Sequence, residues 1–472
     1  MNRKYVLLLL LIPIMVGLMI GIHAYGTYTG LKTYKAALSD GNLNRSISSA
    51  ENLSKQSGQL MSDLNMPVIK QISHIFGLDF SPIKSDISEL IKASPYIAGA
   101  ERPKKFLIAF QNTAEARGTG GILGAFAVVE FNKGNAKIIK SGSNSALASL
   151  SEIPVPVTDE FLRLYGQNPA ILQNSNLSPH FPYGAKIWLG LYQRQFGEDL
   201  DGVIAVDPTA LSYVLRATGS VQANGKIIDN TNVVDETLKD AYKRYEKNNN
   251  ARKQYLVQII NATTKKLMNS QYSRIEMAKA IRQGIIERRI LVYSVDAQAE
   301  KKISASKVGG FLSTTPNNEY RVVIQNIDAS KLDYYLQKNV DISSTSCGAG
   351  RKTTVTVDVS NTLTTGKGLP AYVLTRADKN KPESLVTGAH RFKVFVYGPV
   401  GSKIESAWRK HLSEGIGGQS TERKRPVMVM DVDLAPQKSE KLQVNFVGGK
   451  GKITFVDQPL VRPTLVGIQD RC

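Results

Sequence analysis

The chain has 472 residues, of which 42% are apolar, 7% aromatic and 21% charged. This composition is typical of a globular protein, and it excludes global disorder and a fibrous repeat. Only one apolar run is long enough to span a bilayer, which excludes a polytopic transporter or channel. Sixty Lys and Arg against forty Asp and Glu give a formal net charge of +20, which favours anionic partners.

The N-terminus predicts a membrane anchor. Arg3 and Lys4 precede an uncharged apolar run from Val6 to Ala24, which as a helix covers most of a ~30 Å hydrocarbon core. The basic pair predicts a cytoplasmic N-terminus, with the bulk of the chain on the extracytoplasmic side of the cell membrane. A signal peptide cleaved near Ala24 is the alternative, although the apolar run is longer than such peptides usually carry.

The two cysteines, Cys347 and Cys472, are consistent with an exported body. In an oxidising compartment they can form a disulfide that ties the C-terminus to the start of the last domain. Two unrelated free thiols are the alternative. Neither the cysteine spacing nor the neighbouring histidines suggest a metal site.

The segment after the anchor predicts helices first, and strands alternating with helices afterwards. Apolar residues between positions 28 and 75 recur at an approximately helical spacing, which predicts one or two amphipathic helices. Short apolar or β-branched runs predict strands at 106–111, 122–131, 136–140, 202–206 and 290–294. Helical patterns lie among them at 185–196, 208–218, 232–246, 251–268 and 274–288.

Beyond Lys307 the pattern changes to short, β-branched or alternating segments separated by Gly, Pro, Asn and Lys. They predict strands at 320–326, 353–360, 390–397, 427–434, 441–446 and 452–457. Such strands with few helical signals indicate a β-sandwich. The predicted fold is therefore an N-terminal transmembrane helix, an α/β domain with a central mixed sheet, and a β-sandwich.

The expected organisation has five parts. They are a cytoplasmic tip and transmembrane helix (1–26), a helical membrane-proximal linker (27–100), the α/β domain (101–310), a seam with a short helix (311–345) and the β-sandwich (346–472).

The most distinctive motif is QNTAEARGTGGILG, which begins at Gln111 directly after a predicted buried strand. Its glycines permit positive φ and close backbone approach, so a polar ligand can lie against main-chain amides with an arginine reaching it. The candidate ligand-binding residues are Asn112, Glu115, Arg117, Gly120 and Gly121. The alternative is a tight turn with a structural Asn/Glu/Arg network. The spacing fits neither a phosphate-binding Walker loop nor a dinucleotide fingerprint.

At this motif the chain resembles a known group. QNTAEARGTGGILGAFAVVEFNKGNAKI, together with DGVIAVDPTALSYVLRATGSV at 201–221, resembles the bacterial domain-of-unknown-function family 4012. KLDYYL at 331, GLPAYV at 368 and DQPLVRP at 457 extend the likeness over most of residues 100–465. The resemblance implies a membrane-anchored envelope protein without an established activity.

A fainter resemblance connects the α/β part to the LytR-CpsA-Psr phosphotransferases, which move glycopolymers from polyprenyl-pyrophosphate carriers onto cell-wall peptidoglycan. ARKQYL at 251–256 is similar to that family's Arg/Gln-rich helix start, which implies a ligand-binding role for Arg252 and Gln254. The family's Arg-Asp pair falls near 140–144, where this sequence reads KSGSN. Catalysis would then need Arg117 or Arg244 as a substitute.

Two hypotheses follow. The first is a non-enzymatic envelope protein that binds a phosphorylated glycan or a polyprenyl-phosphate carrier, next to the membrane lipid bilayer and without nucleic acid. The second is an active phosphotransferase that attaches glycopolymers to the wall, for which Mg²⁺ is an admissible cofactor. Asp201 and Asp207 flank a strand and are candidate metal ligands, although Asp207-Pro208 is also an ordinary helix start.

Overall fold

The computed structural model describes residues 22, 24–64, 84–147, 149–269, 272–345, 350–374, 386–409 and 418–471. The chain divides into two compact units. Unit 1 comprises residues 1–106, 129–139 and 292–309, and unit 2 comprises residues 107–128, 140–291 and 310–472.

Unit 1 is helical around a small core. Residues 24–39 are helical and are followed by α2 (Leu43–Leu64), α4 (Lys84–Ile97) and α12 (Ala297–Ser304). The apolar side chains of these helices recur every three or four residues, so they gather on one face of each helix. They form a core that includes Tyr34, Leu38, Ala50, Leu53 and Ala100.

The first sheet has five strands in the order β3-β2-β1-β4-β7. The strands are β1 (Lys104–Arg117), β2 (Gly120–Asn132), β3 (Asn135–Ser143), β4 (Gly202–Val206) and β7 (Ile290–Ser294). A separate two-stranded sheet pairs β5 (Val221–Ala223) with β6 (Lys226–Ile228). The run FLIAF lies inside β1, where its side chains are mostly buried, as its apolar sequence requires.

Of the helices that the structure describes, seven belong to the α/β part of unit 2, and at least three of them begin at a side-chain cap. They are α5 (Asp159–Tyr165), α6 (Phe181–Phe196), α7 (Pro208–Thr218), α8 (Val233–Asp235), α9 (Ala241–Arg244), α10 (Asn249–Asn269) and α11 (Arg274–Ile286). Thr158, Asp207 and Ser273 accept a hydrogen bond from the first turn of α5, α7 and α11.

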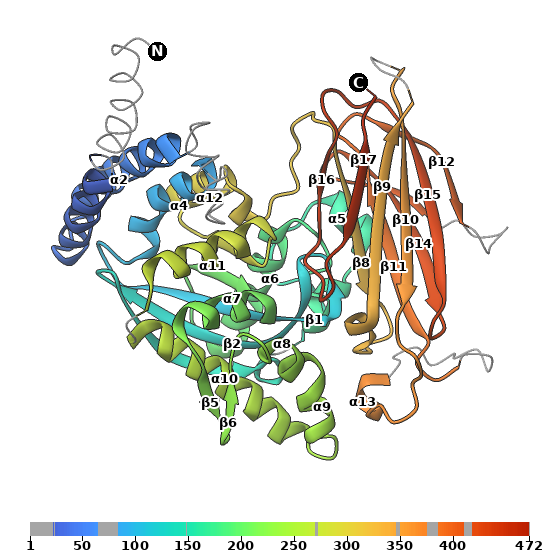
Figure 1. Cartoon of the computed structure of the whole chain (residues 1–472), viewed down its shortest axis with the longest axis horizontal. Helices are drawn as coiled ribbons and strands as arrows, with labels where there is room; N and C mark the ends of the chain where they lie inside the picture. The colour runs from blue at the N-terminus through green and yellow to red at the C-terminus, as the bar shows by residue number, and fades with distance from the viewer. Residues whose placement is uncertain are drawn as a thin grey trace, which may run out of the picture. The chain divides into compact units, whose positions relative to one another are not determined.

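The C-terminal part of unit 2 is β-rich and contains two five-stranded sheets, which stand as two layers in Figure 1. One has the order β12-β15-β10-β9-β17 and the other β13-β14-β11-β8-β16. The first consists of β12 (Lys403–Arg409), β15 (Ser439–Val447), β10 (Lys352–Asn361), β9 (Leu336–Ser344) and β17 (Leu465–Gln469). The second consists of β13 (Gly418–Glu422), β14 (Arg425–Leu434), β11 (His390–Tyr397), β8 (Glu319–Asn326) and β16 (Thr454–Val456). A short helix, α13 (Ala371–Leu374), precedes β11.

Strict alternation of apolar and polar residues builds the core of the β-rich part. In β10, Val355, Val357 and Val359 are buried, and the residues between them are partly exposed. Val355 lies opposite Val444 of β15 and Ile342 of β9, so apolar residues of neighbouring strands are in register on one face. The buried residues of both sheets form one core, which also takes in Ala116 near the end of β1.

The predicted fold class needs correction. The chain forms a mixed α/β domain with several sheets and a β-rich C-terminal part. The β-rich part begins with β8 and β9, inside the segment that we expected to be a seam. KLDYYL there forms only a 3-10 turn at Leu332–Tyr335 before β9 starts. The strand predicted at 320–326 corresponds to β8, whereas β9 was missed, because the polar residue Lys338 is buried among its apolar residues and breaks the alternating pattern.

The predicted membrane anchor is not supported. Within the described residues, no helix is both long enough and apolar enough to cross a membrane. The long helix α2, for example, carries Arg45, Glu51, Lys55 and Asp63, which are costly in hydrocarbon. Most of the predicted span lies outside the described residues, which exclude 1–21 and 23. The single-pass membrane placement that depended on this span is therefore not retained.

The predicted disulfide is not retained either. Cys347 and Cys472 both lie outside the described residues. The part of the chain that the structure describes therefore contains no disulfide to tie the C-terminus down. The C-terminal segment is held instead by β17, which pairs in parallel with β9.

Candidate functional site

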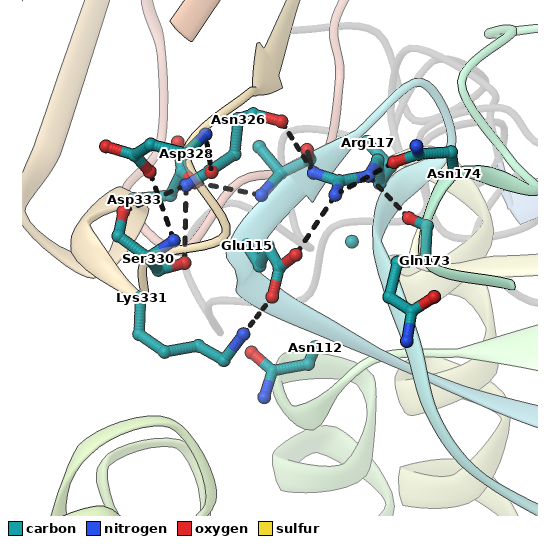
Figure 2. Close-up of polar contacts among 12 residues, drawn as sticks. Asn112, Glu115, Arg117, Gln173, Asn174, Asn326, Asp328, Ser330, Lys331 and Asp333 are labelled. Carbon is teal, nitrogen blue, oxygen red and sulfur yellow. Dashed lines mark hydrogen bonds and ion pairs between the residues drawn. The ribbon is translucent and has the colours of Figure 1, made fainter. Parts of the chain in front are cut away.

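Arg117, at the end of β1, is buried and fully engaged by the protein itself (Figure 2). Its Nε donates to the carbonyl of Gln173 at 2.7 Å, and one terminal nitrogen donates to the carbonyl of Asn326 at 2.9 Å. The other terminal nitrogen is 3.0 Å from a carboxylate oxygen of Glu115. Burial lowers the pKa of Arg117 to about 10, while Asp333 and Asp328 oppose that shift. Arg117 therefore joins three segments of unit 2 and has no donor turned toward solvent.

Glu115 links Arg117 to a second buried cation, Lys331, as Figure 2 shows. Burial lowers the pKa of Lys331 to about 7, and Asp333 opposes this shift. Asp333 accepts hydrogen bonds from the amide of Ala116 and the side chain of Asn326. Burial favours the neutral form of Asp333, but His390 and these two donors outweigh it and hold the pKa of Asp333 below its usual value. The network is a structural connection between the end of β1 and the β-rich part.

The glycines of the motif serve close backbone packing. A Cβ atom at Gly121 would lie 2.2 Å from the carbonyl oxygen of Asn112, so only glycine fits between β1 and β2 there. Gly120 has a φ of 132°, a conformation that side chains rarely adopt, and a Cβ atom there would lie 3.2 Å from Pro459. The carbonyl of Gly121 accepts a hydrogen bond from Asn176. Both glycines pack against protein atoms and do not border an open ligand-binding loop.

Arg252, near the start of α10, is also buried. Its guanidinium lies 4.2 Å from the ring centre of Tyr242 and 4.0 Å from that of Tyr372, which is cation–π distance. Asn112 donates to the hydroxyl of the same Tyr242 at 2.7 Å. The Nε of Arg252 has no hydrogen-bond partner among the described residues. Arg252 and Asn112 therefore meet at Tyr242, away from the surface.

Gln254 lies elsewhere, in an open groove between the end of β3 and one face of α10. The groove has a volume of about 490 Å³, within the range of roughly 300–1,000 Å³ that is common for ligand sites. Its wall consists of Gly142, Ser143, Ser145, Asn250, Lys253, Gln254, Val257 and Gln258. The KSGSN segment and the ARKQYL segment, more than 100 residues apart in sequence, thus form one site.

The groove is polar and positively charged. Among the described residues that line it, none is acidic, and Lys253 is the one cation. Lys253 has no ion-pair partner within the described part of the chain. Burial lowers the pKa of Lys253, and the neighbouring charge of Arg252 lowers it further. An anion bound beside Lys253 would stabilise its charged form and oppose the lowering of its pKa, so the groove favours a negatively charged ligand.

A second hollow, of about 220 Å³, lies beside Lys331. It is lined mainly by apolar and aromatic side chains, including Leu238, Tyr335, Leu369 and Val373. The ammonium of Lys239 at its wall is already 2.8 Å from Asp235. The hollow is smaller than common ligand sites, and two of its lysines, Lys239 and Lys331, are paired with protein carboxylates.

The candidate metal ligands do not assemble a metal site. Both carboxylate oxygens of Asp207 are engaged: one accepts from the amide of Ala210 at 2.7 Å, and the other is 2.7 Å from Arg289. Across the described residues, no group of three or more His, Cys, Asp or Glu side chains could hold a metal ion. The donor set at Asp207 therefore does not fit Mg²⁺.

Sequence patterns alone missed the residues that matter most in this geometry. Lys331 belongs to KLDYYL, which we noted for a family likeness and as a short helix at the seam, and not as part of a site. Gly142 and Ser143 lie in the KSGSN segment where an Arg-Asp pair was expected, so we interpreted this segment as the loss of that pair and not as the wall of a groove. The helical spacing of Asn250, Lys253, Gln254 and Gln258 on one face of α10 was the signal that could have located the groove.

The family likeness predicted from the motifs is confirmed. Residues 101–242 match the family model described as "Protein of unknown function (DUF4012)". The matched segment contains β1, β2, β3 and β4, and it therefore includes the Asn112–Arg117 motif and one wall of the groove. No curated protein sequence shows a significant match to the chain.

Solved bacterial structures resemble part of the chain. Protein gbs0355 from Streptococcus agalactiae is 14% identical, with 44% of this chain and 74% of that chain covered and a TM-score of 0.28. The transcriptional regulator yvhJ from Bacillus subtilis is 14% identical, with coverages of 46% and 84% and a TM-score of 0.23. A transcriptional regulator from Enterococcus faecalis is 13% identical, with coverages of 47% and 78% and a TM-score of 0.25. At these TM-scores the likeness carries no inference about activity.

Proposed function

We propose that this chain binds a phosphorylated glycan in the groove between the end of β3 and α10. The observation that carries the proposal is the composition of the groove wall, which combines hydroxyls, side-chain amides and one unpaired lysine. Sugar hydroxyls both donate and accept hydrogen bonds, and so do Ser143, Ser145, Gln254 and Gln258. A phosphate group would pair with the ammonium of Lys253 in a charge-assisted contact.

The same wall favours a glycan over the polyprenyl chain of a lipid carrier. Of the residues that line the groove, only Val257 has a sizeable apolar side chain. A polyprenyl chain needs apolar surface to bury, since its transfer from water is what would hold it. The ligand part that the groove suits is therefore the phosphorylated sugar.

Phosphotransfer is the less favoured function. Such a reaction needs a group that takes the proton of the attacking hydroxyl, and no described residue of the groove wall is a carboxylate or a histidine. Arg117 and Arg252, the arginines expected to stabilise the transferred phosphate, are each buried against protein partners. Binding without turnover is the function that these contacts support.

A titration of the full chain with N-acetylglucosamine 1-phosphate tests the proposal. Isothermal titration calorimetry should detect binding, and Lys253→Ala should weaken it by roughly tenfold or more, because a hydrogen bond to a charged group is lost. Lys265→Ala is the matched control, since Lys265 lies on the same helix, is exposed and does not line the groove.

Raising the pH provides a further check on the same residue. Because the pKa of Lys253 lies below the usual value for lysine, its charge is lost at a lower pH than that of an exposed lysine. Affinity for the sugar phosphate should therefore fall in the alkaline range in the wild type and stay low throughout in Lys253→Ala. The proposal would be refuted if the wild type, Lys253→Ala and Lys265→Ala bound the sugar phosphate with equal affinity, or if the wild type did not bind it.

A further inference from the structure

A small cavity beside the turn between β1 and β2 presents two arginines. Gly118 and Thr119 of the turn line it together with Arg288, Arg321 and Asp457. Its volume is about 10 Å³, which is close to the space that one water-sized atom occupies. It shares no lining residue with the groove beside α10.

The backbone at Arg288 is in a conformation that glycine normally takes. Helix α11 ends at Ile286, Glu287 is its C-cap, and Arg288 follows with a φ of 58°. Glycine is the usual residue at this position after a helix, because a Cβ atom is disfavoured in the left-handed region. An arginine here carries a backbone strain that glycine would avoid. Observed strain of this kind points to a role for the side chain.

The Arg288 side chain has no hydrogen bond or ion pair with any residue that the structure describes. The carboxylates nearby are already engaged by other cations. Glu319 is 2.8 Å from Arg321, and Asp457 is 2.9 Å from Lys338. The cavity wall therefore carries one guanidinium without a counter-ion.

The electrostatics of the neighbourhood agree with this excess of positive charge. Burial lowers the pKa of Arg288 to about 9, and the charge of Arg321 adds to the shift, against Glu319 and Asp457. The same two arginines, with Arg423 and Lys186, also lower the pKa of His180 after its burial. A negative charge in the cavity would stabilise the positively charged forms of these arginines, of Lys186 and of His180.

We infer that this cavity binds a small oxyanion of the phosphate type, with one charged oxygen held between Arg288 and Arg321. A guanidinium suits an oxyanion because it keeps its positive charge and donates charge-assisted hydrogen bonds to a charged oxygen. The cavity admits only one oxygen-sized atom. Because Arg288 is only half-buried, the remainder of the anion lies at the opening toward solvent. This site is independent of the glycan proposal, since its residues and its ligand are different.

The test uses the full chain, titrated with inorganic phosphate at constant ionic strength maintained with chloride. Arg288→Gly should weaken phosphate binding at least tenfold, as expected for the loss of a charge-assisted contact. The same variant should unfold at an equal or higher temperature without phosphate, because glycine removes the backbone strain. Loss of binding can therefore be separated from loss of folding.

Lys424→Gly is the matched control. Lys424 is exposed, has a φ of 63° and does not line the cavity, so this change also removes one cation from a left-handed position. It should leave phosphate affinity unchanged. Arg288→Gly should also retain its affinity for N-acetylglucosamine 1-phosphate, and Lys253→Ala should retain its affinity for inorganic phosphate.

Three outcomes would overturn the inference: no phosphate binding by the wild type, full binding by Arg288→Gly, or equal weakening by Lys424→Gly. Phosphate binding that is lost in Lys253→Ala and kept in Arg288→Gly would place the anion in the groove, which would leave the glycan proposal standing. Sugar phosphate binding that is lost only in Arg288→Gly would instead assign the phosphate ester to the cavity.

Discussion

Arg117 and Lys253 differ in what surrounds them, and that difference decides what each cation can do. Arg117 donates to three backbone carbonyls and one carboxylate inside the protein. Lys253 has no such partner and faces a groove without acidic residues. Both residues lie in polar stretches of sequence. Arg117 was predicted to bind a ligand because it belongs to the more distinctive motif. The donors of Arg117 are used within the protein, so its role is structural. The ammonium of Lys253 faces the groove, as the proposed binding of an anionic ligand requires.

Replacing Arg117 tests this assignment. Arg117→Met should lower the free energy of unfolding by about 3–5 kcal/mol, because Glu115 would lose one partner of a buried ion pair. Urea denaturation measures the loss. Arg163→Met, at an exposed arginine of α5, should change stability by no more than about 0.5 kcal/mol. Unchanged stability with lost affinity for the sugar phosphate would instead make Arg117 a ligand-binding residue.

At the scale of elements, the sequence shows which residues cap a helix. It does not show which distant residues the same capping side chains contact. Asp207-Pro208 reads as a helix start, and Asp207 does cap α7. Its second oxygen contacts Arg289, which lies at the start of β7 and is 82 residues away in sequence. Burial raises the pKa of Asp207 even though Arg289 lowers it, so the aspartate depends strongly on this partner.

Two capping variants separate the local contribution from the distant one. Asp207→Ala should cost about 3–5 kcal/mol, since it removes both a cap and the partner of a buried arginine. Thr158→Ala, which removes only the cap of α5, should cost about 1 kcal/mol. Thermal or urea denaturation provides the comparison. Equal losses, or a wild-type midpoint that rises when Mg²⁺ is added, would contradict this account of Asp207.

At the scale of the whole molecule, buried polar contacts hold the α/β part and the β-rich part of unit 2 together. Glu422 of β13 accepts hydrogen bonds from Ser178, from Tyr397 and from Tyr165 of α5. Burial raises the pKa of Glu422, although these three donors and Arg423 oppose the shift. Lys331 and Arg117 make the corresponding connection at the end of β1 (Figure 2).

The raised pKa of Glu422 predicts a pH dependence of stability. Above the ordinary pKa of 4.5, the folded state holds a proton on Glu422 that the unfolded state has released. The contribution of Glu422 to stability is therefore fully present below pH 4.5 and is lost as the pH rises through the folded-state pKa. Glu422→Gln should lack this decline in urea midpoints measured upward from pH 4.5.

Glu152→Gln is the control for the pH series, because Glu152 is exposed and makes no contact of this kind. It should show the same decline as the wild type. If the urea midpoints of Glu422→Gln declined with pH as those of the wild type do, the protonation of Glu422 would not be the source of the pH dependence.

Local signals in the sequence determined a good deal of this protein. Alternating valines at 353–360 predicted a strand, and β10 spans Lys352–Asn361. The motif after Gln111 pointed to the family that residues 101–242 match. Such features can be predicted from sequence because strand alternation, helix caps and motifs each depend only on a few neighbouring residues.

Only the tertiary structure decided which polar residues are buried and which line the groove that we propose as a ligand site. The groove needs the end of β3 beside α10, and the Arg117 network needs Asn326 and Lys331 beside β1. These partners are more than 100 residues apart, so no local pattern can encode their meeting. The role of a polar side chain depends on the groups that replace its water, and those groups come from elsewhere in the chain.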